Sequence, residues 1–449
     1  MRSGSDLVNS QLERFIERYA NKRKPVTVNF RRLLPSLNSA ERFTHLLHPY
    51  PAKLLQHIPY FFLNNTLLSG RGDVVLDPFC GSGTVLLEAS IAGRHAFGSD
   101  TNPLATLISR VKASRVDPGR LHKRLHQLTL AQTCSADIQV DLPAFLDWDY
   151  WFHPHVQRQL AQLRSCIEGI ADREIREFFL VCFSACVRRV SLADPRLSVP
   201  VRLKPDQYRA GHWLREKTEA RLRRLKRINV INVFSMIAEQ NIRRMAAYLK
   251  GSAEYGSVTA NRQDARCLNM TDGSVQLVIT SPPYLGAQKY ARSSSLQLGW
   301  LGLVSERGFQ ELKSQTIGRE QFQKHQICEQ NLTGIAPSAR SIIKSAGRKN
   351  ALRAHIASQY LADVSQAISE ISRVLVPGGY CVLVVGNNHL CGQQFRTQAF
   401  ISEIAATHNL SVCAKLVDAI RSRGLMTKRN RTADLIAREW VLVLRKQQP

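Results

Sequence analysis

The sequence predicts a doubly wound α/β fold, in which helices cover both faces of a mainly parallel sheet. Three observations predict it. A strand-turn-helix-strand unit occupies residues 73–100, helical periodicity interrupts the strand pattern over residues 115–255, and strand patterns resume from residue 256 to the end. The fold class is therefore a doubly wound, mainly parallel sheet with an antiparallel C-terminal hairpin and a large helical insertion.

The first unit runs from DVVLDPF (residues 73–79), a buried strand that ends in an acid, through the tight turn CGSGT to the helix VLLEASIAGR. HAFGSD (residues 95–100) predicts a second strand that also ends in an acid. Since the connection between these strands contains a helix, they are expected to be parallel neighbours.

Later segments supply the rest of the sheet. Strands are predicted at GSVTANRQDA, SVQLVITSPPY and YCVLVVGNN, and the segments SVCAKLVDAI and IAREWVLVLRK predict a hairpin joined by a basic loop. A polar stretch is expected over residues 305–355. The helix AHIASQYLADVSQAISEISRVL is expected to end at Pro377-Gly378-Gly379.

Composition points to a basic globular protein of the cytoplasm. Lys and Arg number 62 against 35 Asp and Glu, giving a net charge of +27, and hydrophobic residues make up 44%. Such an excess favours a nucleic-acid partner. No apolar run approaches the ~20 residues of a spanning helix, and no signal peptide is evident. The ten cysteines form no CxxC or zinc-type cluster, and no third ligand accompanies His122 and His126, so no metal is expected.

The first chemical motif is the octet DPFCGSGT at the end of the first strand. It contains Asp77, Pro78, Phe79, Gly81, Gly83 and Thr84. Glycines in such a turn let the backbone approach a ligand closely. Asp100 ends the next strand, 17 residues after Gly83, where an acid can accept hydrogen bonds from ribose hydroxyls. A nucleotide-like cofactor fits this pattern, and a tight turn with a capping aspartate is the simpler alternative.

The second motif, TSPPY, follows the apolar strand VQLVI and contains Ser281, Pro282, Pro283 and Tyr284. Two prolines fix the backbone and remove two N–H donors, so carbonyl oxygens remain to accept hydrogen bonds from a ligand. Tyr284 offers an aromatic face on which a flat ring can stack. A base with an exocyclic amine suits both features, and a rigid turn at a strand end is the alternative.

The two motifs together resemble those of the DNA amino-methyltransferases, in particular the site-specific cytosine-N4 type. DPFCGSGT resembles the cofactor motif and TSPPY the catalytic motif. THLLHPYPAK (Thr44–Lys53) is similar to the segment that closes over the cofactor in that family. Three further segments are also similar to family sequences: SLQLGWLGL, VLVPGGYCVLVVGNN and NRTADLIAREWVLVLR. The resemblance implies a Rossmann-like methyltransferase fold and S-adenosyl-L-methionine as cofactor. It also implies a catalytic domain at residues 41–114 and 256–449. Residues 1–40 are polar and basic, with a helical stretch near Leu12–Tyr19, and are interpreted as an arm.

The resemblance also implies roles for single residues. Asp77, Pro78, Phe79, Gly81, Gly83 and Thr84 would shape the cofactor pocket, with Asp100 at the ribose, Asp264 near the adenine amino group, and His48 and Lys53 in the closing segment. Ser281 and the Pro282 carbonyl would accept the hydrogens of the target amine while Pro283 stiffens the loop and Tyr284 stacks on a flipped base.

Ser281 at the first motif position favours cytosine N4 over adenine N6. Methylation at carbon 5 is excluded because it needs a cysteine that usually follows proline, and the chain has no Pro-Cys pair. After the catalytic tyrosine, Ala287-Gln288-Lys289-Tyr290 departs from the expected AIDY pattern by carrying lysine in place of the acid.

The insertion, residues 115–255, is the candidate DNA target-recognition region. From Arg196 to Lys250 it holds 14 Lys or Arg against four acids. Candidate phosphate contacts are Arg221, Arg223, Arg224, Lys226 and Arg227, with Arg429 and Arg431 from the C-terminal loop, although each alone fits a solvated surface. Double-stranded DNA is the expected partner, with a cognate restriction endonuclease or a defence-system subunit as a further candidate. Adenine-N6 methylation, RNA base methylation and a non-catalytic nucleic-acid-binding subunit remain the alternatives.

Overall fold

A computed structural model describes residues 4–37, 42–51, 53–131, 142–251, 254–286, 290–323, 326–327, 335–419 and 438–448. Eight of its strands form one sheet in the order β1-β9-β10-β6-β5-β2-β3-β4. They are β1 (Val26–Thr27), β2 (Val74–Asp77), β3 (His95–Asp100), β4 (Val258–Arg262), β5 (Val275–Thr280), β6 (Leu375–Gly386), β9 (Leu410–Ala419) and β10 (Arg438–Lys446). Two short strands, β7 (Asn388–Leu390) and β8 (Gln393–Phe395), pair separately.

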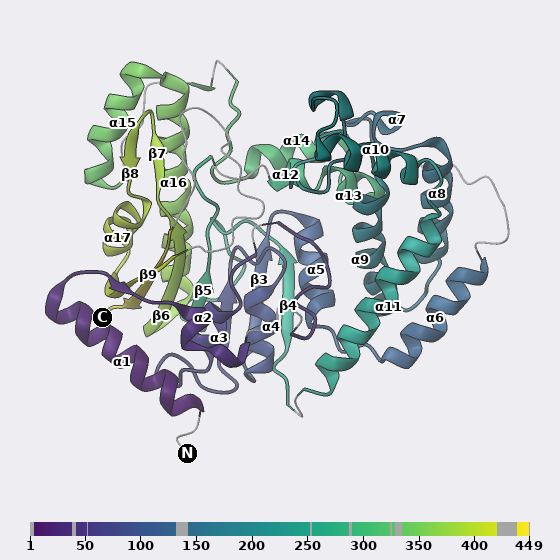
Figure 1. The fold of residues 1–449 in the computed structure, drawn as a ribbon. Coiled ribbons are helices and arrows are strands. Elements are labelled where there is room, and N and C mark those ends of the chain that lie inside the picture. The colour runs from purple at the N-terminus through teal and green to yellow at the C-terminus, as the bar shows by residue number, and fades with distance from the viewer. Residues whose placement is uncertain are drawn as a thin grey trace.

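The sheet is mainly parallel. β4, β3, β2, β5 and β6 pair in parallel, whereas β10 runs antiparallel to both β6 and β9. This pattern confirms the predicted doubly wound sheet with an antiparallel C-terminal hairpin, which is a Rossmann-like methyltransferase fold (Figure 1). Because the five parallel strands run in one direction, their carboxyl ends meet at one edge of the sheet.

Helices cover both faces of the sheet. One face packs against α1 (Gly4–Lys22), α2 (Phe30–Leu33), α3 (His57–Leu63) and α4 (Thr84–Ile91), and the other against α15 (Pro337–Lys349), α16 (Ala351–Val374) and α17 (Thr397–Thr407). Side chains alternate between the two layers along each strand, so Val75 of β2 packs with the first set and Leu76 with the second. Apolar burial on both faces thus holds the sheet rigid beneath its carboxyl edge.

The N-terminal segment, predicted as a basic arm, packs into the fold. Val8, Leu12, Phe15 and Tyr19 of α1 are buried against the sheet, and β1 pairs in parallel with β9. The spacing of these four residues places them on one face of a helix, which explains why the segment folds onto the sheet edge.

The helical region gathers segments from both sides of the catalytic motif. It comprises α5 (Pro103–Ala113), α6 (Pro118–Ala131), α7 (Trp148–Trp151), α8 (Pro154–Glu168), α9 (Arg173–Val190), α10 (Trp213–Leu225) and α11 (Val230–Leu249), joined by α12 (Tyr290–Ser293), α13 (Ser295–Trp300) and α14 (Glu306–Gln315). Figure 1 shows this region beside the sheet, opposite α1 and α15–α17. Its core is shared, since the rings of Phe183 in α9 and Trp300 in α13 lie 6.5 Å apart. None of the described helices is long and apolar enough to cross a membrane.

The structure adds detail to two segments of the C-terminal half. The stretch at residues 305–355 contains α14, α15 and the start of α16, because buried Phe309, Leu312 and Ile343 anchor amphipathic turns. The long helix ends at Val374, before the Pro-Gly-Gly sequence. Its last carbonyls accept hydrogen bonds from the backbone of residues 273–274, and β6 begins at once.

Candidate active site

A pocket lies at the carboxyl edge of the sheet. Its walls come from the turns that follow β2, β3, β4 and β5, from the closing segment and from the region of α12 and α14. The lining residues are Tyr50, Pro51, Pro78, Phe79, Gly81, Asp100, Thr101, Asn102, Gln263, Asp264, Ala265, Ser281, Pro283, Tyr290, Ala291, Leu312, Gln315, Thr316 and Ile317. Both sequence motifs therefore contribute to one cavity.

The glycine turn after β2 depends on conformations that favour glycine. Gly81 and Gly83 have φ angles of +48° and +72°. A Cβ atom at Gly83 would also come within 2.8 Å of the Ser109 hydroxyl oxygen on α5. The turn can therefore pack tightly against α5 and deliver the chain into α4, which begins at Thr84.

Asp100 links the glycine turn to the next strand. Its carboxylate accepts hydrogen bonds from the backbone N–H groups of Gly81, at 3.0 Å, and Asn102, at 2.9 Å. Burial raises the pKa of Asp100 to about 6, although these two hydrogen bonds lower it. Since Asp100 also lines the pocket, an oxygen of this carboxylate can accept a hydrogen bond from a ligand hydroxyl.

Asp77 is buried behind the pocket instead of lining it. Its carboxylate accepts hydrogen bonds from the Thr280 hydroxyl at 2.5 Å and the Phe79 N–H at 3.2 Å. Burial raises the pKa of Asp77 to about 7. Asp77 thus ties the turn after β2 to the end of β5, where the catalytic motif begins.

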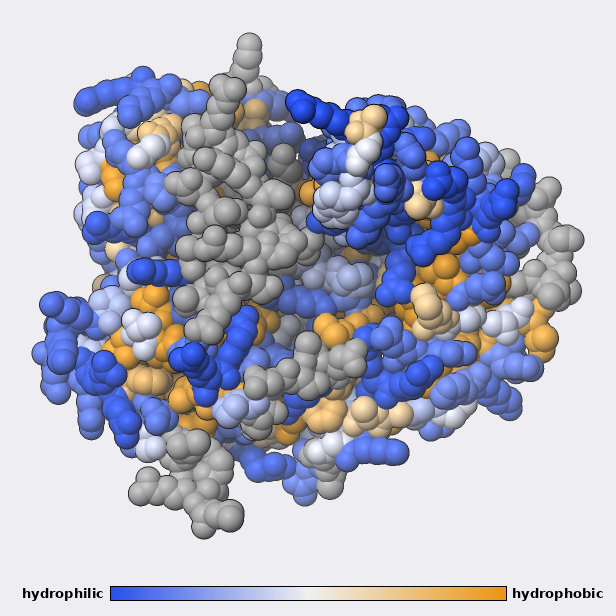
Figure 2. All heavy atoms as spheres, in the orientation of Figure 1, coloured by the Kyte–Doolittle hydropathy of each residue, from blue (hydrophilic) through white to orange (hydrophobic). Residues whose placement is uncertain are grey.

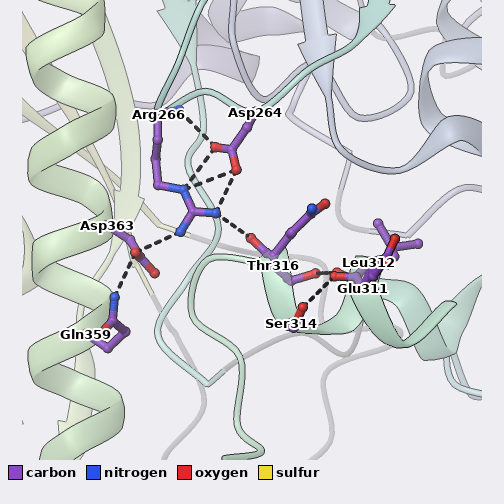
Figure 3. Close-up of polar contacts among 9 residues, drawn as sticks. Asp264, Arg266, Glu311, Leu312, Ser314, Thr316, Gln359 and Asp363 are labelled. Carbon is purple, nitrogen blue, oxygen red and sulfur yellow. Dashed lines mark hydrogen bonds and ion pairs between the residues drawn. The ribbon is translucent and has the colours of Figure 1, made fainter. Parts of the chain in front are cut away.

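Asp264 lines the pocket and is held by Arg266 (Figure 3). The guanidinium donates to both carboxylate oxygens, with a shortest distance of 2.6 Å, and also to Asp363 on α16 at 2.8 Å and to the Gln315 carbonyl at 3.1 Å. These contacts raise the pKa of Arg266. Arg266 therefore joins two walls of the pocket, the turn after β4 and the end of α14, to α16.

The TSPPY motif places Ser281 and Pro283 at the pocket wall, whereas Pro282 is buried. The Ser281 hydroxyl donates its hydrogen to the Val384 carbonyl at 2.9 Å. With its hydrogen committed to β6, the Ser281 oxygen is left as an acceptor. After the motif, the Gly286 N–H donates to the Gly318 carbonyl, so the loop is braced against the segment that follows α14.

Tyr284 does not belong to the pocket lining. Its side chain is half-buried, and its hydroxyl interacts with Ser281 and with the Glu439 carboxylate on β10. Burial, with the charge of Glu439 next in size, raises the pKa of Tyr284 well above its usual value. The Tyr284 hydroxyl is thus engaged by Ser281 and Glu439, and Tyr290, which follows the motif, is among the pocket-lining residues.

Charge in the pocket distinguishes between cofactors. The described lining residues include two carboxylates, Asp100 and Asp264, and no lysine or arginine. Such a wall is a poor site for a pyrophosphate and a good one for a cation such as a sulfonium. Apolar surface from Phe79, Leu312 and Ile317 can cover a flat ring. The residues present therefore fit S-adenosylmethionine.

Comparisons with known proteins relate the chain to DNA methyltransferases. The N6/N4 methyltransferase family model, described as a DNA methylase, matches residues 15–109, which carry the closing segment, the glycine turn and Asp100. The Type II methyltransferase M.MvaI of Kocuria varians is 25% identical over 411 residues, covering 88% of each chain. M.MjaII of Methanocaldococcus jannaschii is 35% identical over 91 residues, which is 20% of this chain and 17% of that one.

These matches support a DNA amino-methyltransferase of the N6/N4 family. A SAM-dependent methyltransferase from Methanosarcina mazei covers 86% of this chain and 97% of its own, at 10% identity and a TM-score of 0.31. The fold of the chain is defined by its own sheet order.

The two basic residues predicted in the closing segment lie away from the pocket. His48 is buried, with Nε2 3.0 Å from the Ser184 hydroxyl, and burial lowers its pKa to about 3. Lys53 donates from Nζ to the carbonyls of His45 and His48, and burial lowers its pKa to about 8. Both hold the segment in shape, and its residues Tyr50 and Pro51 reach the pocket instead.

The predicted DNA contacts fall into three groups. Arg223, Arg224, Lys226 and Arg227 are exposed around the C-terminal end of α10. Arg221 is half-buried and donates to the Arg189 carbonyl at 3.1 Å. Arg429 and Arg431 lie outside the described residues, as does Lys289 of the altered AIDY pattern.

Sequence reasoning missed several lining residues. Asn102 is the N-cap of α5, accepting from the Leu104 N–H, and donates to the Tyr50 hydroxyl at 3.1 Å. An Asn-Pro pair two residues after a strand-ending acid was an available signal for it. Leu312, Gln315, Thr316 and Ile317 carried no such signal, because only tertiary packing brings α14 to the sheet edge.

No group of three candidate metal ligands occurs in the part of the chain that the structure describes.

Proposed function

We propose that this DNA methyltransferase transfers a methyl group to cytosine N4 of a base flipped out of duplex DNA, within a specific sequence. The observation that carries the proposal is Ser281, which lies at the pocket wall with its hydrogen donated to Val384. Its oxygen can therefore only accept, which suits a target that donates N–H hydrogens.

The chemistry follows from the poor nucleophilicity of a base amine. Its lone pair is delocalised into the ring, and acceptors that draw the two N–H bonds out of the ring plane restore electron density at nitrogen. Ser281 Oγ and the Pro282 carbonyl are the proposed acceptors, and the prolines keep them in position without competing donors. S-adenosylmethionine, when bound, supplies an electrophilic methyl group on a positively charged sulfur.

The proposed roles of the other residues follow from their positions. Asp100 would accept hydrogen bonds from the ribose hydroxyls, and Asp264, oriented by Arg266, would meet the adenine amino group. Tyr284 would stack on the base. That role requires the ring to leave its contact with Glu439 when DNA binds. A cognate restriction endonuclease or defence-system subunit is the proposed partner, by analogy with the Type II relatives.

The test is incubation with labelled S-adenosylmethionine and mixed-sequence duplex DNA, followed by digestion to nucleosides and mass spectrometry. N4-methylcytosine is the expected product, and Ser281→Ala should lower the rate by about 100-fold or more. Binding of S-adenosylhomocysteine, measured by calorimetry, should change by less than about twofold in that variant. N6-methyladenine as the product would overturn the cytosine assignment, and methylation of structured RNA in preference to DNA would overturn the substrate class.

A further inference from the structure

Three aromatic rings are stacked on the surface of the helical region at the N-terminal end of α10. The ring of His212 lies between those of Tyr208 and Trp213, with centroid distances of 5.5 and 6.1 Å and interplanar angles of 15° and 21°. The outermost ring, Trp213, is 63% exposed, more than any other large apolar side chain among the described residues. An exposed tryptophan at the end of such a stack presents a rigid flat surface to solvent.

The stack is anchored to the protein core at its inner end. The Arg196 guanidinium lies 5.7 Å from the centre of the Tyr208 ring and donates to its hydroxyl at 2.8 Å. Arg196 is held in turn by both carboxylate oxygens of buried Asp194. His212 also caps α10, since its Nδ1 accepts from the Leu214 N–H. The rings are thus positioned before any partner binds, which reduces the entropy cost of using them.

The surface around the stack is strongly basic. Residues 196–227 contain eleven Lys or Arg against three Asp or Glu, a net charge of +8. Two of these acids, Asp206 and Glu219, are paired with Arg215. Lys217 places its ammonium 5.7 Å from the centre of the Trp213 ring. Since Trp213, Lys217 and Arg224 are exposed and spaced by four and seven residues, they share one face of α10.

An aromatic platform surrounded by positive charge fits a partner that offers flat rings and phosphates together. A protein partner would account for the exposed tryptophan but not for a net charge of +8. Figure 1 shows α10 at the same end of the molecule as α12 and α14, which carry pocket residues. The helix that bears the stack therefore lies at the same end of the molecule as two helices of the pocket wall.

We propose that Trp213 and the face of α10 formed by Trp213, Lys217 and Arg224 bind duplex DNA near the methylated base. Trp213 stacks on an exposed base or packs against the sugar edge, while Lys217 and Arg224 contact phosphates. This inference rests on the proposed function, because it assumes that DNA is the substrate, and it adds an aromatic contact to the basic residues proposed from the sequence.

The test is fluorescence anisotropy with a labelled mixed-sequence duplex over a series of salt concentrations. Trp213→Ala should weaken binding by about tenfold without changing the dependence of affinity on salt, since stacking releases no counterions. Trp213→Phe should restore most of the affinity. Lys217→Gln should instead lower the slope of log affinity against log salt by about one unit.

Met236→Ala is the matched control, because Met236 is 54% exposed on α11 of the same insertion but lies outside the stack. It should leave DNA affinity unchanged. Equal binding of S-adenosylhomocysteine by all variants confirms folding. If Trp213→Ala binds and methylates DNA like the wild type, this inference is overturned and the proposed function stands. If the wild-type protein binds no DNA, both are overturned.

Discussion

The pocket at the sheet edge and the surface of the insertion differ most in charge. The described residues that line the pocket include two carboxylates and no basic side chain, whereas residues 196–227 carry a net charge of +8. The net charge of +27 is therefore unevenly distributed. The basic surface attracts a polyanion, and the acidic pocket excludes its phosphates while favouring a cationic cofactor.

The two regions also differ in how they are built. The pocket depends on backbone turns, in which Gly81, Gly83 and the two prolines of the motif determine where the chain can go. The insertion presents side chains from the outside of helices. A change in the first region should displace several groups together, while a change in the second should remove one contact at a time.

The largest effect is expected at Gly83, where a single substitution tests whether a change in the pocket turns displaces several groups together. Gly83→Ala must strain a φ of +72° and push Ser109 away, so S-adenosylhomocysteine affinity should fall by about 100-fold or more in calorimetry. Gly72→Ala is the matched control, since Gly72 has a φ of +79° but nothing within 4 Å of the added Cβ. It should cost only about 1–2 kcal/mol of stability. Similar affinities in the two variants would show that the close approach to α5 is unimportant.

The next largest effect is expected in the pH dependence of stability, to which Asp77 contributes. Its pKa of about 7 in the folded state is above that of the unfolded chain, so folding favours the protonated form. The stability that it contributes is full below about pH 4 and is lost as the pH rises through 7. Between pH 5 and pH 8, the free energy of unfolding of the wild type should therefore fall by about 2–3 kcal/mol more than that of Asp77→Asn. Urea unfolding at the two pH values measures this difference. Parallel pH profiles for the two proteins would contradict the burial argument.

A smaller effect is expected at Arg266. Arg266→Ala releases Asp264 and the end of α14, and we expect the affinity for S-adenosylhomocysteine to fall by about tenfold. Arg373→Ala is the control, because Arg373 makes a similar network with Glu370, Asp272 and two carbonyls away from the pocket. Both variants should lose stability, and only the first should lose cofactor affinity. An equal loss of affinity would make Arg266 a general structural residue.

Much of the fold and part of the site could be predicted from local patterns. The strands that end at Asp77 and Asp100 were located because a buried apolar run, a turn and strand-ending acids are recognisable within short segments. The packing of the N-terminal helix was not predicted, because it contacts β9, at the opposite end of the chain, and Phe61 of α3. Helices α14 and α15 were missed because their polar faces outweigh a few apolar anchors.

The sequence by itself determined the glycine turn, the acid that ends β3 and the serine that follows β5, since each depends on backbone conformations and residue types within a few positions. Tertiary structure alone decided which side chains face the cavity: Tyr50 in place of His48 and Lys53, the end of α14 beside Asp264, and Tyr284 turned toward Glu439. It also decided that Trp213 is exposed on a preformed stack. The physical reason is that the direction of a side chain is set by the packing of segments that are distant in sequence, and no local pattern encodes it.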